Sequence, residues 1–508
     1  MFVRKKRNKS GSTSVLIVEK RAGKYVVLKR LGYSKDENEI KYLVEEAKHL
    51  IADLKEQELL NFGNSQKDEN ILNFLKYNKS LKIKVVGPEL LLGKIFDSIG
   101  FNVIEDKLFR HMVLSRLVQP LSKLKTVDYL RRYQGIRLSV QSLYDSLDRL
   151  DKLYKEKVEQ IAFEHSKKIL KTISVVFYDM TTVYFEAEDE DDLRVVGFSK
   201  DGKFQKPQIM LGLLVGEYGY PIAYEVFKGN TFEGHTLIPV IKDFQAKYGF
   251  KQAIVIVDAG LLNKSNLQNL AELRYEFIIA ARLSSETNLI KKEILKKSKA
   301  MKNGDSFELK KTANIRLIVS YSDKRAKKDK HNRDKGLKRL KKRLSSGKLT
   351  KEHINKRGYN KFLLLTGKIK IEIDKEKVLQ DQLWDGLKAY LSNTSLSAKE
   401  IIQNYNHLWQ IERAFRISKT DLRIRPIFHR KERRIRSHIC ISFVAYTIYK
   451  ELERLLKKSN IDLSAQKAIE ISKTIYEMSF VLPNSRKKEK VLVNLTDEQK
   501  LVLRVSHP

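Results

Sequence analysis

The chain has 508 residues, with 100 Lys and Arg against 62 Asp and Glu, so its formal net charge is +38. A hydrophobic share of 42% excludes a largely disordered protein. The single cysteine, Cys440, excludes a disulfide framework and a CxxC zinc site. No apolar run reaches the ~20 residues of a membrane span, and the N-terminus lacks the apolar region of a secretory signal. We expect an intracellular protein with no membrane partner. Its charge favours nucleic acid as the partner; the alternative is a lysine-rich surface that is only solvated.

The N-terminal part predicts a small module followed by helices. Residues 14–20 and 25–32 are apolar runs around a short polar turn, as in a β-hairpin. Asp36 then opens an amphipathic helix. The polar residues 62–70 indicate a linker, and beyond it the pattern is helical almost throughout. The expected divisions are a hairpin-plus-helix module over 1–62 and a helical DNA-binding or dimerisation region over 71–170.

The pattern changes at residue 172, where apolar strands begin to alternate with helices. The predicted elements are, in order, a strand ending at Asp179, a hairpin over 207–229, a helix over 235–248, a strand ending at Asp258, a helix near 263–273 and a strand over 276–283. This order indicates an α/β core rather than a repeating βαβ unit, and neither a GxGxxG nor a Walker loop interrupts it. We assign residues 171–283 to the first part of the core.

Residues 284–395 combine short strands with a very basic stretch, and we expect them to form an inserted β-rich domain outside the central sheet. Residues 324–343 hold 12 Lys or Arg among 20. Like charges at this density repel one another unless a polyanion neutralises them, which favours DNA contact over a solvated helix. The expected DNA contacts in this stretch are Lys324, Arg325, Lys327, Lys328, Arg333, Lys338, Arg339, Lys341, Lys342 and Arg343.

The helical pattern returns at residue 396. Ser397, with Glu400 three residues later, is the capping-box arrangement that begins a helix. We expect residues 396–454 to complete the α/β core and residues 455–508 to form a helical, basic C-terminal tail.

Three carboxylates are candidates for a metal site. Asp179 and Asp258 each follow an apolar strand, and neighbouring strand ends would bring them close enough to share a cation; each alone fits an ordinary turn residue as well. Glu412 lies on a later helix, with Arg416 and Lys419 on the same face. The alternative there is an exposed helix with ion pairs. Hard oxygen ligands of this kind favour Mg²⁺ or Mn²⁺.

The chain resembles a known protein family in further residues and segments. Tyr405 and Lys419 flank Glu412 in the spacing Tyr-x6-Glu-x6-Lys, and the segments YDMTTVYFE, GFSKDGKFQKPQIMLGLLV, VFKGNTFEGHT and IVDAGLLNKSNL precede them. From about residue 172 to 450 the chain resembles the DDE transposases of bacterial insertion sequences. The similarity is to the insertion-sequence-four type, in the branch with a Tyr-x2-Arg-x3-Glu-x6-Lys signature and a β-strand insertion.

The resemblance implies an RNase H-like catalytic core with a helical N-terminal region and an inserted β-rich domain, and the predicted strand order also fits that core. It implies that Asp179, Asp258 and Glu412 hold two Mg²⁺ or Mn²⁺ ions for DNA cleavage and strand transfer. It also implies that Tyr405 and Lys419 position the DNA backbone.

Leu408 departs from the signature, which has Arg at that position, so Arg413 or Arg416 would supply the lost phosphate contact. The implied partners are double-stranded DNA, as terminal inverted repeats and as target, and a second copy of the chain in a synaptic complex. The implied location is the bacterial cytoplasm, at the nucleoid. Two alternatives stay open: a non-catalytic DNA-binding protein, and a nuclease on the same core.

Overall fold

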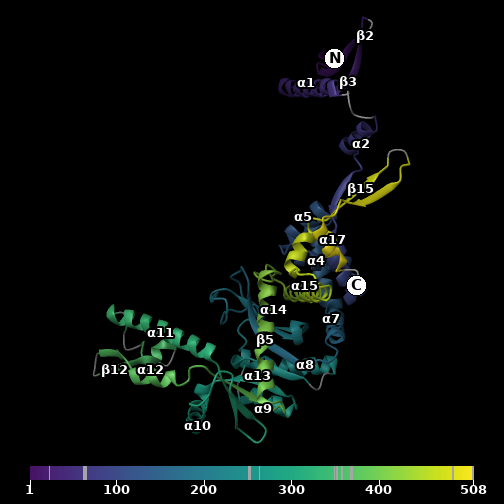
Figure 1. The fold of residues 1–508 in the computed structure, drawn as a ribbon. Helices are drawn as coiled ribbons and strands as arrows, with labels where there is room; N and C mark the ends of the chain where they lie inside the picture. The colour runs from purple at the N-terminus through teal and green to yellow at the C-terminus, as the bar shows by residue number, and fades with distance from the viewer. Residues whose placement is uncertain are drawn as a thin grey trace. The chain divides into compact units, whose positions relative to one another are not determined.

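The computed structural model of the chain describes residues 1–21, 23–60, 66–249, 253–261, 264–347, 349, 353–355, 358–366, 370–482 and 485–505. These residues divide into two compact units, the first of residues 1–83 with 478–491 and the second of residues 84–477 with 492–508. Figure 1 labels the helices and strands. Within the described ranges, no helix combines the length and the apolar character that crossing a membrane requires.

A three-stranded antiparallel sheet and one long helix form the N-terminal part of the first unit. The order of the strands is β1-β2-β3, and the helix covers one face, where Val15 and Ile17 pack against Ala47. The predicted hairpin and helix are confirmed, and a further strand precedes them. The elements are β1 (Phe2–Arg7), β2 (Thr13–Arg21), β3 (Lys24–Ser34) and α1 (Glu37–Leu60).

Two predictions for the rest of this unit are wrong. Residues 66–70, assigned to a linker, begin helix α2 (Gln66–Tyr77), where Phe74 packs edge-on against Phe480; residues 61–65 lie outside the described residues. The C-terminal tail is not wholly helical, because two of its segments pair in a sheet of order β16-β15-β4. These strands are β4 (Lys82–Val85), β15 (Tyr476–Val481) and β16 (Lys488–Leu492).

The second unit begins with a run of short helices, as predicted. Asp106, Ser122 and Ser139 each cap a helix by accepting a hydrogen bond from a first-turn amide. The elements are the π-helix η1 (Glu89–Gly93), α3 (Lys94–Ile99), the 3₁₀ turn η2 (Phe101–Val103), α4 (Lys107–Val118), α5 (Lys123–Gln134), α6 (Val140–Arg149), the π-helix η3 (Leu150–Tyr154) and α7 (Lys155–Leu170).

An eight-stranded mixed sheet forms the centre of the second unit, in the order β10-β11-β14-β9-β8-β5-β6-β7. Strands β5, β6 and β7 are antiparallel neighbours, whereas β8 and β9 run parallel to β5. Strand β14 pairs antiparallel with β9, and β11 and β10 follow. The bounds are β5 (Val175–Tyr184), β6 (Gln208–Val215), β7 (Pro221–Lys228), β8 (Ile254–Val257), β9 (Phe277–Ala281), β10 (Ser306–Lys310), β11 (Arg316–Tyr321) and β14 (Leu387–Ser392).

The expectation that residues 284–395 lie outside the central sheet is wrong. Three of their strands extend the sheet beyond β9, whose outer edge would otherwise present unpaired backbone groups. Leu317 and Leu391 continue the apolar layer of Ile279, so burial favours this arrangement. The remainder forms a small second core around Leu340. This second core is formed by α11 (Asp323–Ser345), the 3₁₀ turn η9 (Gly358–Phe362), the paired strands β12 (Leu363–Thr366) and β13 (Lys370–Ile373), and α12 (Lys375–Gln382). Helix α10 (Asn288–Ser298) packs instead on the core of the central sheet, through Ile294.

Helices cover both faces of the central sheet. Helices α8 and α9 pack on one face, and α13, α14 and α15 on the other; Figure 1 shows α14 alongside β5. The bounds are α8 (Leu237–Tyr248), α9 (Lys264–Glu272), α13 (Ala398–Asn406), α14 (Trp409–Thr420), α15 (Glu432–Lys458), α16 (Ala465–Ser472) and α17 (Asp497–Arg504), with short 3₁₀ turns η4 (Glu217–Gly219), η5 (Glu233–His235), η6 (Ala259–Leu261) and η7 (Leu283–Ser285).

Candidate active site

The parallel pairing of β5 and β8 brings the first two carboxylates side by side. Tyr178 lies opposite Val257, so Asp179 and Asp258 are the next residues along two adjacent strands. Side chains alternate between the two faces along a strand, so residues two positions apart point to the same face. Phe177 and Ile256, two positions before the aspartates, pack beneath α13 to α15. Both carboxylates therefore point to the side of the sheet on which α13 and α14 lie.

Asp179 lies inside β5 rather than at its carboxyl end, because the strand continues to Tyr184. Burial raises the pKa of Asp179, and the charges of Glu233 and Asp258 add to the rise, while Lys200 opposes it. The ammonium of Lys200 lies 3.6 Å from Asp179 Oδ1 and 2.7 Å from Glu233 Oε1. A positive charge thus lies between two carboxylates at the centre of the site.

Lys200 and Glu233 are site residues that sequence reasoning missed. Glu233 lies on η5, and its carboxylate extends to η6. There its Oε2 would be 3.3 Å from a Cβ added at Gly260, so the two segments are close together. Both residues lie in segments that carry the family resemblance, GFSK and FKGNTFEGHT. The resemblance of these two segments to the family is therefore the signal in the sequence that could have identified Lys200 and Glu233.

Helix α13 connects the second aspartate to the C-terminal part of the core. It begins at the predicted capping box of Ser397 and Glu400. Near its end, the hydroxyl of Tyr405 donates a hydrogen bond to Asp258 Oδ1 at 3.0 Å. Tyr405 is only 5% exposed, so its contact is with the carboxylate, whereas the resemblance implied a contact with the DNA backbone.

Glu412 lies in the first turn of α14 and is exposed. Lys388 of β14 lies within the electrostatic range of both Glu412 and Asp258. Burial, followed by the charge of Arg325, lowers the pKa of Lys388, and the charges of Asp258 and Glu412 oppose this. Lys388 Nζ also lies 4.2 Å from the centre of the Tyr405 ring. Sequence reasoning missed Lys388 because it assigned no strand to the short run LKAYLS.

The cations predicted on α14 have different environments. Lys419 is 3.2 Å from Asp201, and 12% of its side chain is exposed. Burial lowers the pKa of Lys419, although Asp201 opposes this. Arg413 pairs with Glu453, whereas Arg416 is exposed. Of the three, Arg416 is therefore the most accessible to DNA.

The departure from the family signature has a structural reason. Leu408 is 9% exposed and belongs to the main apolar core, at the N-cap position of α14. A guanidinium at this position would be buried among apolar side chains, which is costly without a partner.

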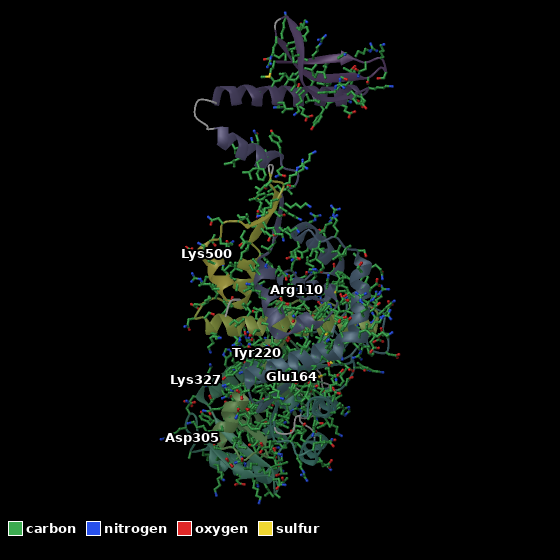
Figure 2. The ribbon with its side chains drawn as sticks, turned by 90° about the vertical axis from the view of Figure 1, so that its right-hand side faces the viewer. Arg110, Glu164, Tyr220, Asp305, Lys327 and Lys500 are labelled. Atoms are coloured by element: carbon green, nitrogen blue, oxygen red, sulfur yellow. The ribbon has the colours of Figure 1, made fainter. Side chains whose placement is uncertain are left out.

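Most of the predicted DNA contacts on α11 are exposed, but Arg333 is not. Its side chain is 4% exposed and makes two hydrogen bonds to Asp385, of 2.5 and 2.6 Å. We therefore exclude Arg333 from the DNA contacts. The exposed members are Lys324, Arg325, Lys327 (labelled in Figure 2), Lys328, Lys338, Arg339, Lys341 and Lys342, with Arg343 half-buried.

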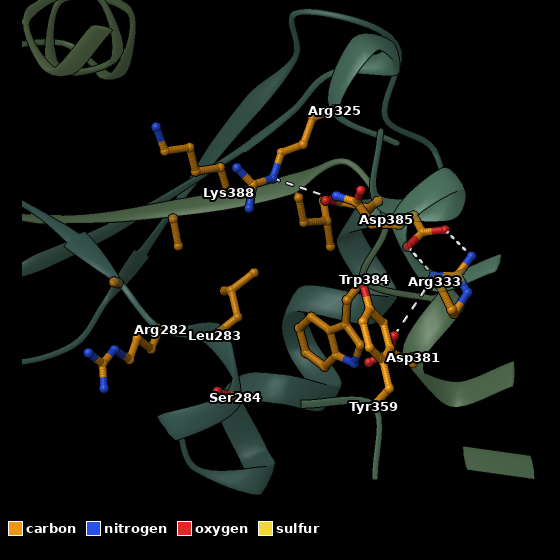
Figure 3. A pocket seen from close by; sticks show the side chains of 15 residues that line it. Arg282, Leu283, Ser284, Arg325, Arg333, Tyr359, Asp381, Trp384, Asp385 and Lys388 are labelled. Atoms are coloured by element: carbon orange, nitrogen blue, oxygen red, sulfur yellow. Dashed lines mark hydrogen bonds and ion pairs between the residues drawn. The ribbon is translucent and has the colours of Figure 1, made fainter. Parts of the chain in front are cut away.

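A pocket of about 460 Å³ lies between α11, the end of β9 and the start of β14. Figure 3 shows Arg325 and Lys388 side by side along one rim, with the Arg333–Asp385 pair on another side. The charges of Asp258 and Glu412 act to raise the pKa of Lys388 against the effect of burial, so this rim lies within their electrostatic range.

No group of three or more metal-ligating side chains is close enough together to hold a metal ion, within the part of the chain that the structure describes. The donor chemistry of Asp179, Asp258 and Glu412 fits a hard divalent cation. The position of Lys200 between Asp179 and Glu233 shows that this centre accommodates a positive charge.

The family model for the transposase DDE domain matches residues 170–448, more than half of the chain. The chain belongs to the DDE transposase family. This transposase is therefore an enzyme that binds DNA, cleaves it and transfers strands. DDE transposases generally use divalent metal ions.

No curated protein matches the transposase. Among solved structures, the piggyBac transposase synaptic complex with hairpin DNA is similar with a TM-score of 0.38 and 11% identity, over 76% of each chain. The Mos1 transposase paired-end complex with left transposon end has a TM-score of 0.16 and 14% identity, over 33% of this chain and 56% of that one. The pre-cleavage Mos1 transpososome has the same TM-score and identity, over 37% and 57%. Likeness this low carries no argument about the site.

Proposed function

We propose that this transposase cuts an insertion sequence at its terminal inverted repeats and joins it to target DNA. The observation that carries the proposal is the pairing of β5 with β8, which makes Asp179 and Asp258 neighbours. Helices α13 and α14 bring Tyr405 and Glu412 to the same side of the sheet. The spacing from Tyr405 through Glu412 to Lys419 supports the insertion-sequence-four branch.

We infer an RNase H-like core made of residues 171–283 and 396–454. The order β7-β6-β5-β8-β9 supports this assignment, since three antiparallel strands are followed by two that run parallel to the first of them. Residues 284–395 are then an insertion that lengthens the sheet and carries α11.

In the proposed reaction, Asp179, Asp258 and Glu412 hold two Mg²⁺ or Mn²⁺ ions, which when bound activate the attacking hydroxyl and stabilise the leaving oxygen. Water attacks a phosphodiester at the element end, its proton passes to solvent, and the bond from phosphorus to the 3′ oxygen breaks. The freed 3′-hydroxyl then loses its proton to solvent and attacks a phosphodiester of the target, and the bond from the target phosphorus to its 3′ oxygen breaks, which leaves a 3′-hydroxyl on the target strand. Tyr405 holds the Asp258 carboxylate, and Lys200 orders Asp179 before the substrate binds.

The exposed cations of α11 are the proposed backbone contacts next to this centre. Arg325 lies close to Lys388, and Lys388 lies within the field of Asp258 and Glu412. A DNA strand that crosses the active centre would therefore reach the start of α11. Contacts to phosphates of this kind supply affinity and position rather than sequence recognition.

The open face of the N-terminal sheet is a second proposed DNA surface. Residues 1–35 contain eleven Lys or Arg and one acid, whereas α1 on the opposite face contains seven acids and three lysines. The cross-strand pairs Phe2 with Val18 and Lys20 with Tyr25 place these residues on the open face. There the guanidinium of Arg4 lies 4.8 Å from the centre of the Tyr25 ring. A basic sheet of this kind fits the major groove of duplex DNA.

We also propose that two copies of the transposase pair the two ends of an element, because each copy has one set of the three carboxylates. The net charge of +38 suits a protein that acts on DNA at the bacterial nucleoid.

Joining of a pre-cut element end to a plasmid tests the proposed function. The substrate is a duplex with a free 3′-hydroxyl that carries the inverted repeat flanking the reading frame, mixed with supercoiled plasmid and Mg²⁺. A transposase joins the labelled end to the plasmid. Nicking of the plasmid without joined product would show a nuclease and would contradict the proposal.

A further inference from the structure

A pocket of about 580 Å³ lies in the second unit, between the loop before α5, the segment after α14 and helix α15. Five cationic side chains line it: Arg116, Lys123, Lys125, Arg423 and Arg425. None of the lining residues, which all belong to the described ranges, is acidic. The positive charge of the pocket is therefore not balanced by its own walls.

Lys123 is the least compensated of these cations. It is 6% exposed, and no carboxylate of the described chain forms an ion pair with it or raises its pKa. Burial lowers the pKa of Lys123, and the charge of Arg116 lowers it further. A buried ammonium without a counter-charge is strongly disfavoured unless a ligand supplies one.

Arg116 is held by neutral groups. It is 5% exposed, and its guanidinium donates to the carbonyls of Leu422 and Arg423 at 3.4 and 3.3 Å. His438 Nε2 lies 2.9 Å from the carbonyl of Ile424, which can only accept, so Nε2 carries the proton and Nδ1 accepts from Arg116 at 3.3 Å. Burial lowers the pKa of Arg116 to about 10, so it stays charged at neutral pH.

The acids that the described residues place beside the pocket wall, Asp148 and Asp201, are already paired with arginines. Burial lowers the pKa of His429, which lines the pocket, and the charge of Asp148 opposes this. Asp148 is itself paired with Arg433 at 3.0 Å and with Arg434 at 2.8 Å. The 12-residue helix α5 begins at the pocket, capped by Ser122. Its N-terminal amides and dipole favour an anion there.

We propose that this pocket binds a phosphate group. It combines the unpaired ammonium of Lys123, a guanidinium of Arg116 fixed by backbone carbonyls, and a helix N-terminus. It also adjoins the active centre, because Arg425 lines the pocket and pairs with Asp201, the carboxylate that binds Lys419. The phosphate source at this place is a DNA strand, as an internal phosphodiester or as a 5′-terminal phosphate; this part rests on the proposed function.

Inorganic phosphate tests the pocket in the full chain without DNA or metal. We expect the melting temperature to rise saturably with phosphate at constant ionic strength, and not with chloride. Lys123→Met should abolish the rise and should itself melt no lower than wild type, because it removes an uncompensated buried charge. Lys296→Met removes an exposed charge from α10 and is the matched control that should keep the rise.

A second variant keeps the test valid if Lys123→Met does not fold. Arg423 lies at the exposed end of the pocket, so Arg423→Gln should fold normally and should reduce the rise. The proposal is wrong if phosphate leaves the wild-type melting temperature unchanged. It is equally wrong if both pocket variants respond to phosphate as the wild type does.

Duplex oligonucleotides with and without a 5′-phosphate identify the source. An affinity loss of about tenfold in Lys123→Met for both duplexes indicates an internal phosphodiester, and a loss for the phosphorylated duplex alone indicates a 5′-terminal phosphate. Unchanged binding of both duplexes contradicts DNA as the source. Asp179→Asn should retain the response to inorganic phosphate, so failure of the catalytic proposal can be told apart from failure of this one.

Discussion

The hydroxyl of Tyr405 hydrogen-bonds to the carboxylate of Asp258 at 3.0 Å across a sequence separation of 147 residues. Tyr405 is buried, and its ring packs on Tyr390 with 4.9 Å between the ring centres. Burial and the neighbouring charge of Asp258 raise the pKa of Tyr405, so the hydroxyl keeps its proton and remains a donor. The orientation of the second aspartate therefore depends on α13.

Replacing Tyr405 by Phe removes this hydrogen bond and keeps the buried ring. A hydrogen bond to a charged group contributes about 1.5–3 kcal/mol, so we expect DNA cleavage to slow by about 10-fold to 100-fold and the melting temperature to fall only modestly. Tyr390→Phe is the control, because the same cluster contains it and it does not contact Asp258. A Tyr405→Phe variant that cleaves at the wild-type rate would show that the hydrogen bond is dispensable.

Arg333 and Asp385 form a nearly buried pair that joins α11 to the start of β14. Breaking such a pair from one side costs about 3–5 kcal/mol, so Arg333→Met should lower the free energy of unfolding by that order. The double variant with Asp385→Leu should recover most of the loss, since neither charge is then left alone. Urea denaturation measures both. A loss in the double variant as large as in the single one would contradict the pairing.

The basic helix α11 should control affinity for DNA rather than chemistry. Changing four of its exposed lysines to Gln should weaken binding and lower the slope of log K against log salt by roughly 0.9 for each lost phosphate contact. The four lysines are Lys327, Lys338, Lys341 and Lys342.

The matched control for that variant removes the same charge from the region of α10. Gel shifts over a salt series compare the two variants with the wild type. An equal slope for the α11 variant and the wild type would show that α11 is only a solvated face. The control lysines are Lys292, Lys296, Lys299 and Lys302.

Stability at acid pH should depend on Glu451, which is 3% exposed and accepts hydrogen bonds from Tyr220 and Arg454. Burial raises the pKa of Glu451, but Arg454 and His165 lower it by more, and the result is about 2. The folded chain thus binds fewer protons than the unfolded chain between about pH 4.5 and 2. This contribution is present above that window and is lost as the pH falls through it.

At about 1.4 kcal/mol per unit, the contribution of Glu451 is about 3 kcal/mol. Glu451→Gln should be less stable than wild type at pH 7 and should lose less stability between pH 5 and 3. Denaturant titrations at each pH measure this, with the exposed Glu470→Gln as the control. Parallel pH curves for wild type and Glu451→Gln would contradict the assignment.

Local patterns in the sequence predicted the elements that position the site. The apolar runs before Asp179 and Asp258 are short-range signals, and both strands form. Ser397 and Glu400 lie within one helical turn, so their capping box could be read directly. The parallel order of β5 and β8 then follows from the helix between the hairpin and β8.

Features that depend on distant partners could not be predicted in this way. Arg333 is one of many cations in a basic run, and only Asp385, 52 residues later, distinguishes it. Residues 387–392 form a strand because β9 offers an edge, which the sequence of that segment does not reveal. Lys123 and Arg423 line one pocket although they are 300 positions apart.

The proposed chemistry requires Asp179, Asp258 and Glu412 to act as one catalytic group. Asp179→Asn and Glu412→Gln each remove a negative ligand and nearly preserve shape, while binding rests on distributed contacts to phosphates. The decisive measurement is Mg²⁺-dependent cleavage of element-end DNA by each variant, with a gel shift on the same duplex. We predict loss of cleavage with wild-type affinity for both variants. Cleavage at the wild-type rate by either variant would contradict the proposed site.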